Sequence, residues 1–181
     1  MEFPALTTVR LVLRELLRGD ATDVLVFRGD PEVQKYDDPR IHTLQEATDF
    51  IEEIRQACAN QEQQMWAVTF KGNDTVIGLV SLQQPDHRSD RYHRRAEVGY
   101  SLARASWGQG IGFEAVRAVV TYGFAHLKLN RIYAGTIADN HKSVRLLERL
   151  GFVHEGTQRQ HSLEEDGRFH DSAMYGLLRS D

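Results

Sequence analysis

The stretch WGQGIG, residues 107–112, lies between a predicted strand (96–102) and a predicted helix (112–126). Its three glycines occupy alternate positions, so the backbone can approach a ligand without obstruction by Cβ atoms. A helix that begins here directs its free amides and the positive end of its dipole towards the same loop. The segment therefore predicts an anion site suited to a pyrophosphate.

Two better-known phosphate loops fit this stretch poorly. A Walker loop needs a Gly-Lys-Ser/Thr sequence after its spacing, and none is present. A Rossmann fingerprint normally opens the first strand–helix unit, and an acidic residue ends the next strand. Here the loop lies past mid-chain and the following strand runs into Ile-Ala-Asp-Asn at 137–140. The pattern therefore argues against dinucleotide binding.

Strand and helix patterns alternate on both sides of the loop. Predicted strands cover residues 9–16, 65–70, 76–83, 96–102 and 131–137, with two more between 152 and 179. Predicted helices cover residues 20–28, 43–58 and 112–126, and a fourth is capped by Asn140 and ended by Gly151. These patterns predict one α+β domain over 1–181, with about seven strands in a mixed, mostly antiparallel sheet and about four helices.

Three details of this reading depend on local chemistry. Thr43 and Glu46 form a capping box at the start of the second helix. The first strand is expected to place Val9, Leu11 and Leu13 on one face. Prolines at 31 and 39 are expected to bracket an acidic loop.

Composition narrows the class of protein. The 181 residues are 41% hydrophobic and 27% charged, which is ordinary for a globular domain. A net charge of -4 argues against a nucleic-acid partner. One cysteine, Cys58, excludes an internal disulfide, and the histidines show no zinc-protease spacing, so no metal is expected. No apolar run suits a membrane span and no signal pattern opens the chain, so we expect a cytoplasmic protein.

Several short segments together resemble one superfamily. They are WGQGIG at 107–112, Glu-Ala at 114–115, Asn-His-Lys-Ser at 140–143, Leu-Gly-Phe at 150–152 and Glu-Gly at 155–156. Others are RLVLR at 10–14, PEV at 31–33, GRFHD at 167–171 and MYGLL at 174–178. The first set resembles the acetyl-CoA signature of the GNAT acyltransferases. The second resembles their Rim-type (RimJ/RimL-like) branch, the ribosomal-protein N-terminal acetyltransferases.

The resemblance implies an acetyl-CoA site built largely from backbone. The amides of residues 109–112 would hold the pyrophosphate, and the strand end near Leu102 would pair with the pantetheine arm, between two strands that splay apart. Asn140 would hydrogen-bond the arm. The implied cofactor-binding residues are Leu102, Trp107, Gly108, Gln109, Gly110, Ile111, Gly112, Asn140 and Ser143. Tryptophan at 107 replaces the more usual Arg or Gln and suggests packing rather than charge at that corner.

Acetyl transfer to an amine needs a neutral amine, a stabilised thioester oxygen and support for the leaving thiolate. Direct attack in a ternary complex requires no covalent intermediate on the protein. Glu97, on the strand that leads into the loop, is the candidate base, or it holds a cationic substrate. Many relatives carry a tyrosine seven residues after the asparagine, where this chain has Leu147. Ser143, in the first turn of the same helix, is the candidate acid that the resemblance to the Rim-like branch implies.

The sequence says less about which amine accepts the acetyl group than about the cofactor. Resemblance to the Rim type favours a protein or peptide N-terminal α-amine. A polyamine is a rival, because acidic residues gather around the first loop: Asp30, Glu32, Asp37 and Asp38. A small-molecule amine is a third possibility, and a non-catalytic acyl-CoA-binding module is an alternative of another class. A homodimer through an edge strand at 169–178 is also considered.

Overall fold

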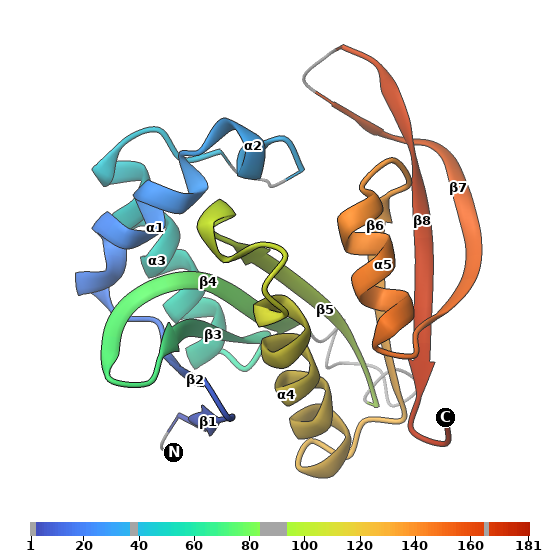
Figure 1. Ribbon diagram of the computed structural model, residues 1–181, viewed down its shortest axis with the longest axis horizontal. Helices are drawn as coiled ribbons and strands as arrows, with labels where there is room; N and C mark the ends of the chain where they lie inside the picture. The colour runs from blue at the N-terminus through green and yellow to red at the C-terminus, as the bar shows by residue number, and fades with distance from the viewer. Residues whose placement is uncertain (1–2, 37–39, 84–93, 165–166) are drawn as a thin grey trace.

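The computed structural model describes residues 3–36, 40–83, 94–164 and 167–181. Its strands form one eight-stranded sheet in the order β1-β2-β3-β4-β5-β6-β8-β7 (Figure 1). The strands are β1 (Leu6–Thr7), β2 (Leu11–Glu15), β3 (Gln63–Phe70), β4 (Asn73–Gln83), β5 (Arg95–Leu102), β6 (Arg131–Ile137), β7 (Val153–Leu163) and β8 (Phe169–Leu178). The α-helices are α1 (Ala21–Arg28), α2 (Pro31–Gln34), α3 (Leu44–Ala59), α4 (Ile111–Ala125) and α5 (His141–Arg149).

The sheet is antiparallel except where β5 meets β6. These two strands pair in parallel over three residues, from Arg95 opposite Arg131 to Glu97 opposite Tyr133. The pairing stops there, and the two strands diverge towards their carboxyl ends (Figure 1). The splayed, mixed and mostly antiparallel sheet expected from the sequence is thus confirmed.

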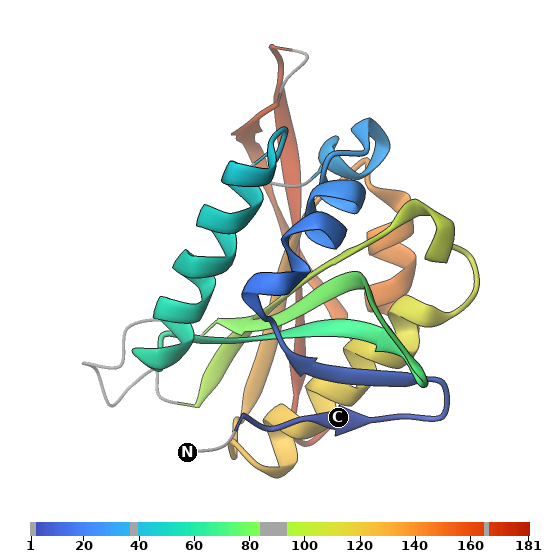
Figure 2. The ribbon, with the colours of Figure 1, turned by 90° about the vertical axis from the view of Figure 1, so that its left-hand side faces the viewer.

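Each face of the sheet has its own apolar core. One core joins α4 to alternate residues of the central strands and includes Trp66, Val98 and Val116. The other lies beneath α1 and α3 and includes Val24 and Ile51. The sheet, with β5 near its middle, therefore separates two layers of helices. Figure 2 shows α1 and α3 together on one side of the strands.

The caps and apolar stripes in the sequence predict the long helices close to where the structure has them. Thr43 accepts the Glu46 amide at 3.1 Å at the start of α3. The apolar stripe of α4 is buried along its length: Ala115, Val116, Val119 and Val120. Gly151 has a φ of 92°, which is the left-handed conformation expected just after α5.

Three expectations were wrong. Val9 precedes β2 and is 85% exposed, whereas Leu11 and Leu13 are fully buried. The start of the acidic segment is a short helix, α2, because Asp30 caps it through the Glu32 amide and Pro31 occupies its first position. Strand β8 (169–178) lies between β6 and β7, so β7 forms the sheet edge. The expected exposed loop at 86–95 falls largely outside the described residues.

Candidate active site

The glycine-rich loop closes into a turn at the start of α4. Gly108 and Gly110 have φ values of 73° and 75°, which side chains other than glycine adopt at a cost. A Cβ at Gly112 would lie 2.9 Å from the Leu102 side chain. The first two glycines thus allow the turn, and the third allows α4 to approach β5. The free amides of the first helical turn point out of this loop.

A buried carboxylate ties the loop to the N-terminal strands. Glu114, in the first turn of α4, is 9% exposed. It accepts the Thr8 hydroxyl at 2.6 Å, the Arg10 amide at 2.8 Å and the Arg10 guanidinium at 2.6 Å. Arg10 also donates to the Gln109 carbonyl at 3.0 Å. Burial alone would raise the pKa of Glu114, but these hydrogen bonds together lower it.

Trp107 combines packing with a hydrogen bond. Its indole N–H donates to the Leu102 carbonyl at 2.8 Å, which links the loop to the end of β5. The Lys142 ammonium lies 3.9 Å from the centre of the indole ring. Packing at this corner was expected, but a positive charge is present as well, supplied by α5. Two further cations, Arg117 and Arg149, lie over Phe113 beside the loop.

The open edge of β5 faces the gap between β5 and β6. The Ala103 amide donates to the Ile77 carbonyl of the neighbouring segment, away from the gap. Backbone groups alternate in direction along a strand. Those of Leu102 and Tyr100 therefore point away from β4, beyond the last β5–β6 pair, and among them the Leu102 carbonyl already accepts the Trp107 indole.

Asn140 and Ser143 begin helix α5 beside this gap. The Asn140 side-chain oxygen accepts the Ser143 amide at 3.3 Å and so caps the helix. The Ser143 hydroxyl lies 2.7 Å from the hydroxyl of Tyr100 on β5. Leu147, where many relatives carry a tyrosine, is an aliphatic side chain fully buried in the core, so it supplies no acid.

Glu97 lies at the point where the β5–β6 pairing stops. Its carboxylate accepts a hydrogen bond from the Gly135 amide of β6. Burial raises the pKa of Glu97, and the bond from Gly135 opposes part of that rise. A carboxyl with a raised pKa is a better proton acceptor once it is ionised. By strand alternation, Glu97 points to the face opposite Tyr100.

A cleft of about 520 Å³ opens on that opposite face, between α3 and strands β4 and β5. Its lining includes Gln83, the cross-strand partner of Glu97, and Gly99, two residues further along β5. Glu97 therefore lies next to lining residues of the cleft without being one of them. The remaining lining residues are Arg28, Phe50, Glu53, Ile54, Ala57, Glu62, Gln63, Met65, Leu79, Ser81, Tyr100 and Ser101.

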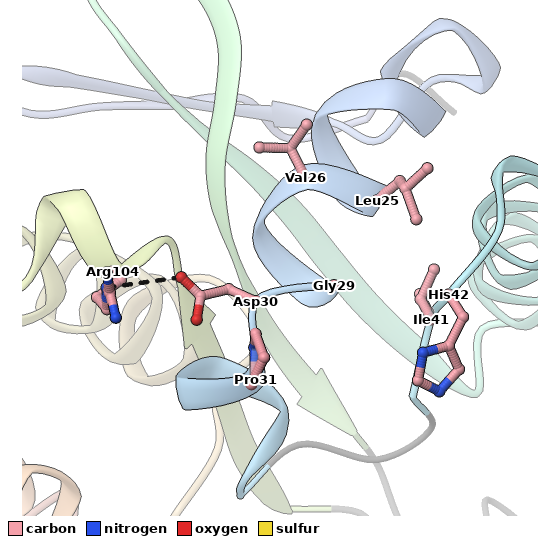
Figure 3. Close-up of a pocket in the computed structure, with 8 residues that line it drawn as sticks. All are labelled: Leu25, Val26, Gly29, Asp30, Pro31, Ile41, His42 and Arg104. Carbon is pink, nitrogen blue, oxygen red and sulfur yellow. Dashed lines mark ion pairs between the residues drawn. The ribbon is translucent and has the colours of Figure 1, made fainter.

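A second hollow lies between α1, the start of α2 and the segment that precedes the glycine-rich loop. Figure 3 shows Asp30 turned towards Arg104, with the two side chains paired at 3.6 Å. Asp30 also caps α2. One carboxylate of the expected acidic cluster is therefore already engaged, and Asp37 and Asp38 lie outside the described residues.

The sequence-based residues separate into two groups. Asn140, Ser143, Leu102 and the loop lie on the α4–α5 side of β5. Glu97 lies on the other face of the strand, beside the cleft-lining residues Gln83 and Gly99. The sequence analysis missed Arg10, Tyr100 and Lys142 as site residues. A strand or helix pattern gives no signal for contacts across such distances in sequence.

None of the helices described is long and apolar enough to cross a membrane. Within the described residues, no group of three or more His, Cys, Asp or Glu side chains is arranged to hold a metal ion.

Curated relatives cover nearly the whole chain. An uncharacterized N-acetyltransferase, p20, from Bacillus licheniformis is 35% identical over 96% of both chains. A spermidine N(1)-acetyltransferase from Vibrio cholerae is 28% identical over 94% of both.

Solved structures share the fold. A GNAT-family acetyltransferase from Bacillus anthracis aligns with a TM-score of 0.86 at 22% identity, covering 98% of this chain and all of its own. A ribosomal-protein-S5-alanine acetyltransferase from Vibrio fischeri aligns at 0.84 and 23% identity, over 98% of both chains. At such identities the likeness shows the fold alone.

One family accounts for these matches. Residues 10–153 match the acetyltransferase (GNAT) domain family, over most of the chain and across the loop, the gap and the start of α5. The chain belongs to the GNAT family of N-acetyltransferases, whose fold uses acetyl-CoA.

Proposed function

We propose that this protein transfers the acetyl group of acetyl-CoA to the α-amine of a peptide or protein N-terminus. One observation carries the proposal. The β5–β6 pairing ends at Glu97, which lies beside the gap and next to two cleft-lining residues, its cross-strand partner Gln83 and Gly99 of β5. An amine in the cleft and a thioester in the gap would then meet beside one carboxylate.

The loop side would hold acetyl-CoA. The amides of residues 109–112 would bind the pyrophosphate, supported by the helix dipole of α4. The open edge of β5 near Leu102, together with the Asn140 side chain, would hydrogen-bond the pantetheine arm. Lys142 and Trp107 would add a cation and an apolar surface at the loop corner.

Glu97 would act as the base. The attacking amine must lose a proton, and Glu97 would take it directly or through one water molecule. As the nitrogen bonds to the acyl carbon, the carbon–sulfur bond breaks and its electron pair stays on sulfur. Ser143 would donate to that sulfur from the opposite side of β5.

The cleft favours a peptide over a polyamine. Arg28 lies in its lining, is 5% exposed, and places its guanidinium 4.9 Å from the centre of the Phe50 ring. A guanidinium can donate to the carbonyl oxygens of a peptide, whereas it repels the ammonium groups of a polyamine.

A polyamine remains a second candidate because of the exposed carboxylates of the cleft. Glu53 and Glu62 lie in the lining and face solvent, where they would attract a polycation. One relative is named a spermidine N(1)-acetyltransferase.

The direct test measures thiol release from acetyl-CoA with pooled acceptors: N-terminal peptides, polyamines and small amines. We expect release with the peptide pool. The double substitution Glu53→Gln and Glu62→Gln should raise the acceptor KM strongly for a polyamine and slightly for a peptide. Release only with polyamines would replace the peptide proposal. Tight acetyl-CoA binding without turnover in any pool would indicate a non-catalytic acyl-CoA-binding protein.

A further inference from the structure

Two hydroxyl groups meet across the gap between β5 and α5. The phenol oxygen of Tyr100 lies 2.7 Å from the hydroxyl oxygen of Ser143 and 3.4 Å from the Ser143 carbonyl oxygen. Tyr100 belongs to the strand and Ser143 to the first turn of the helix. The contact therefore spans the two elements that bound the proposed thioester site.

Proton counting fixes the direction of this hydrogen bond once a ligand is present. A serine hydroxyl has one proton to donate and two lone pairs to accept with. If Ser143 donates to a sulfur in the gap, its 2.7 Å contact must be donated by Tyr100. The result is a chain of two hydrogen bonds that point towards the sulfur, and such chains are cooperative.

We propose that Tyr100 is a positioning residue for the leaving group: it donates to Ser143 and aims the Ser143 hydroxyl at the thioester sulfur. This inference rests on the proposed function. Leu147, one turn beyond Ser143 on α5, is fully buried, so the strand supplies the phenol on this side of the gap.

The chemistry of the phenol decides what the pair does. Burial raises the pKa of Tyr100 to about 12, against a partial lowering by the bond to Ser143. An ordinary thiol has a pKa of roughly 8.5, so a thiolate is too weak a base to remove the phenol proton. The pair therefore stabilises the thiolate as an anion. The proton lost by the amine passes to Glu97 or water and balances the charge.

The test titrates the thiol of CoA bound to the protein. The ultraviolet absorbance of the thiolate is followed against pH in the wild type, Tyr100→Phe, Ser143→Ala and the double variant. We expect wild-type protein to lower the pKa of the bound thiol below that of free CoA. Each single substitution should raise it, and the double variant should match Ser143→Ala. Ser143→Thr, which keeps the hydroxyl, should restore most of the effect.

Turnover provides the second readout. Tyr100→Phe should lower kcat about tenfold, less than the hundredfold or more that follows loss of a donor in direct contact, with KM for acetyl-CoA unchanged. Tyr122→Phe is the matched control, because Tyr122 lies in α4 and its ring packs on the rings of Trp66 and His126. Fluorotyrosine at position 100 keeps the ring and makes the phenol a stronger donor, so it should lower the pKa of the bound thiol further.

Two outcomes would overturn the inference. One is a bound-thiol pKa that is equal in the wild type, Tyr100→Phe and the fluorotyrosine protein. The other is a double variant whose loss is the sum of the two single losses, since Tyr100 would then act independently of Ser143. Failure of CoA to bind the wild type would instead overturn the proposed function itself, which keeps the two failures distinct.

Discussion

The two sides of strand β5 offer different chemical groups to a ligand: backbone amides on one side and side chains on the other. On the α4–α5 side, a loop of backbone amides is fixed by Trp107 and by the ties from Glu114 to Arg10. On the α3 side, the cleft is lined mainly by uncharged side chains, together with Arg28, Glu53 and Glu62. A site made of backbone depends on geometry, whereas a site made of side chains depends on residue identity. The cofactor and the acceptor should therefore respond to different mutations.

The largest effect is expected at the boundary of the two sides. Glu97→Gln should lower kcat roughly a hundredfold, the scale of a lost general base, without changing acetyl-CoA affinity. In the parent protein, kcat should fall as the pH drops through the raised pKa of Glu97, and the variant should lack this limb. A variant that kept its kcat would exclude Glu97 as the base.

The same substitution carries a stability prediction of opposite sign. The folded state raises the pKa of Glu97 above the unfolded value, so ionising it in the fold destabilises the protein as the pH rises. Glu97→Gln should therefore be more stable than the parent at neutral pH and equal to it in acid. Urea unfolding at both pH values measures this difference.

The next largest effect is expected from Glu114→Ala, which disturbs only the glycine-rich loop side of β5. Glu114→Ala removes the acceptor of three partly buried hydrogen bonds from Thr8 and Arg10, which costs about 2 kcal/mol in the free energy of unfolding. Acetyl-CoA affinity should fall with it. The folded state lowers the pKa of Glu114, so the loss should be full at neutral pH and shrink as the pH falls below 4.5.

A matched control for Glu114 lies on the surface. Glu52 pairs with Arg18 through side chains that are 41% and 75% exposed. Glu52→Ala should change stability much less, because solvent screens an exposed pair. An equal fall in the free energy of unfolding in the two variants would show that the Glu114–Arg10 pair stabilises the protein no more than an exposed ion pair does.

The smallest effects are expected from adding one methyl group on each face of the sheet, by Gly78→Ala on one face and Gly99→Ala on the other. A Cβ at Gly78 would meet the Leu102 side chain and, at 2.6 Å, the Ser101 carbonyl oxygen. Gly78→Ala should lower kcat/KM for acetyl-CoA roughly tenfold, because displacements of about 1 Å are costly at a reacting site. A Cβ at Gly99 would lie 2.9 Å from the Ser81 hydroxyl in the cleft.

Gly99→Ala should therefore raise the acceptor KM and leave acetyl-CoA kinetics unchanged. Steady-state kinetics with each substrate varied in turn separates the two glycine variants. If both changed the same KM, the division of the site between the two faces of β5 would be wrong.

Much of the fold could be read from the sequence because its signals are local. The helix of residues 111–125 follows from its apolar stripe, and Gly151 follows from the left-handed turn after α5. The place of the glycine-rich loop before this helix could be predicted as well, whereas its role as a pyrophosphate site stays a prediction. Local chemistry would also have revealed α2, since Asp30 and Pro31 are both helix-start residues.

The remaining features depend on contacts between distant segments. The bond between Tyr100 and Ser143 joins residues 43 positions apart, and the ties between Arg10 and Glu114 span 104. No periodicity encodes such pairs. The interior position of β8 was missed for the same reason, because packing between distant segments sets the strand order. The exposure of Val9 was missed as well.

The short pairing between β5 and β6 has a consequence for the stability of the whole molecule. In the described residues the β5–β6 ladder covers three residue pairs, followed by the bond from the Gly135 amide to Glu97, so the connection between strands β1–β5 and strands β6–β8–β7 is short. A ligand lying in the gap would act as a reversible cross-link between them. Above its Kd, the free energy of unfolding would rise with the logarithm of its concentration. Resistance to proteolysis would then follow the supply of acetyl-CoA.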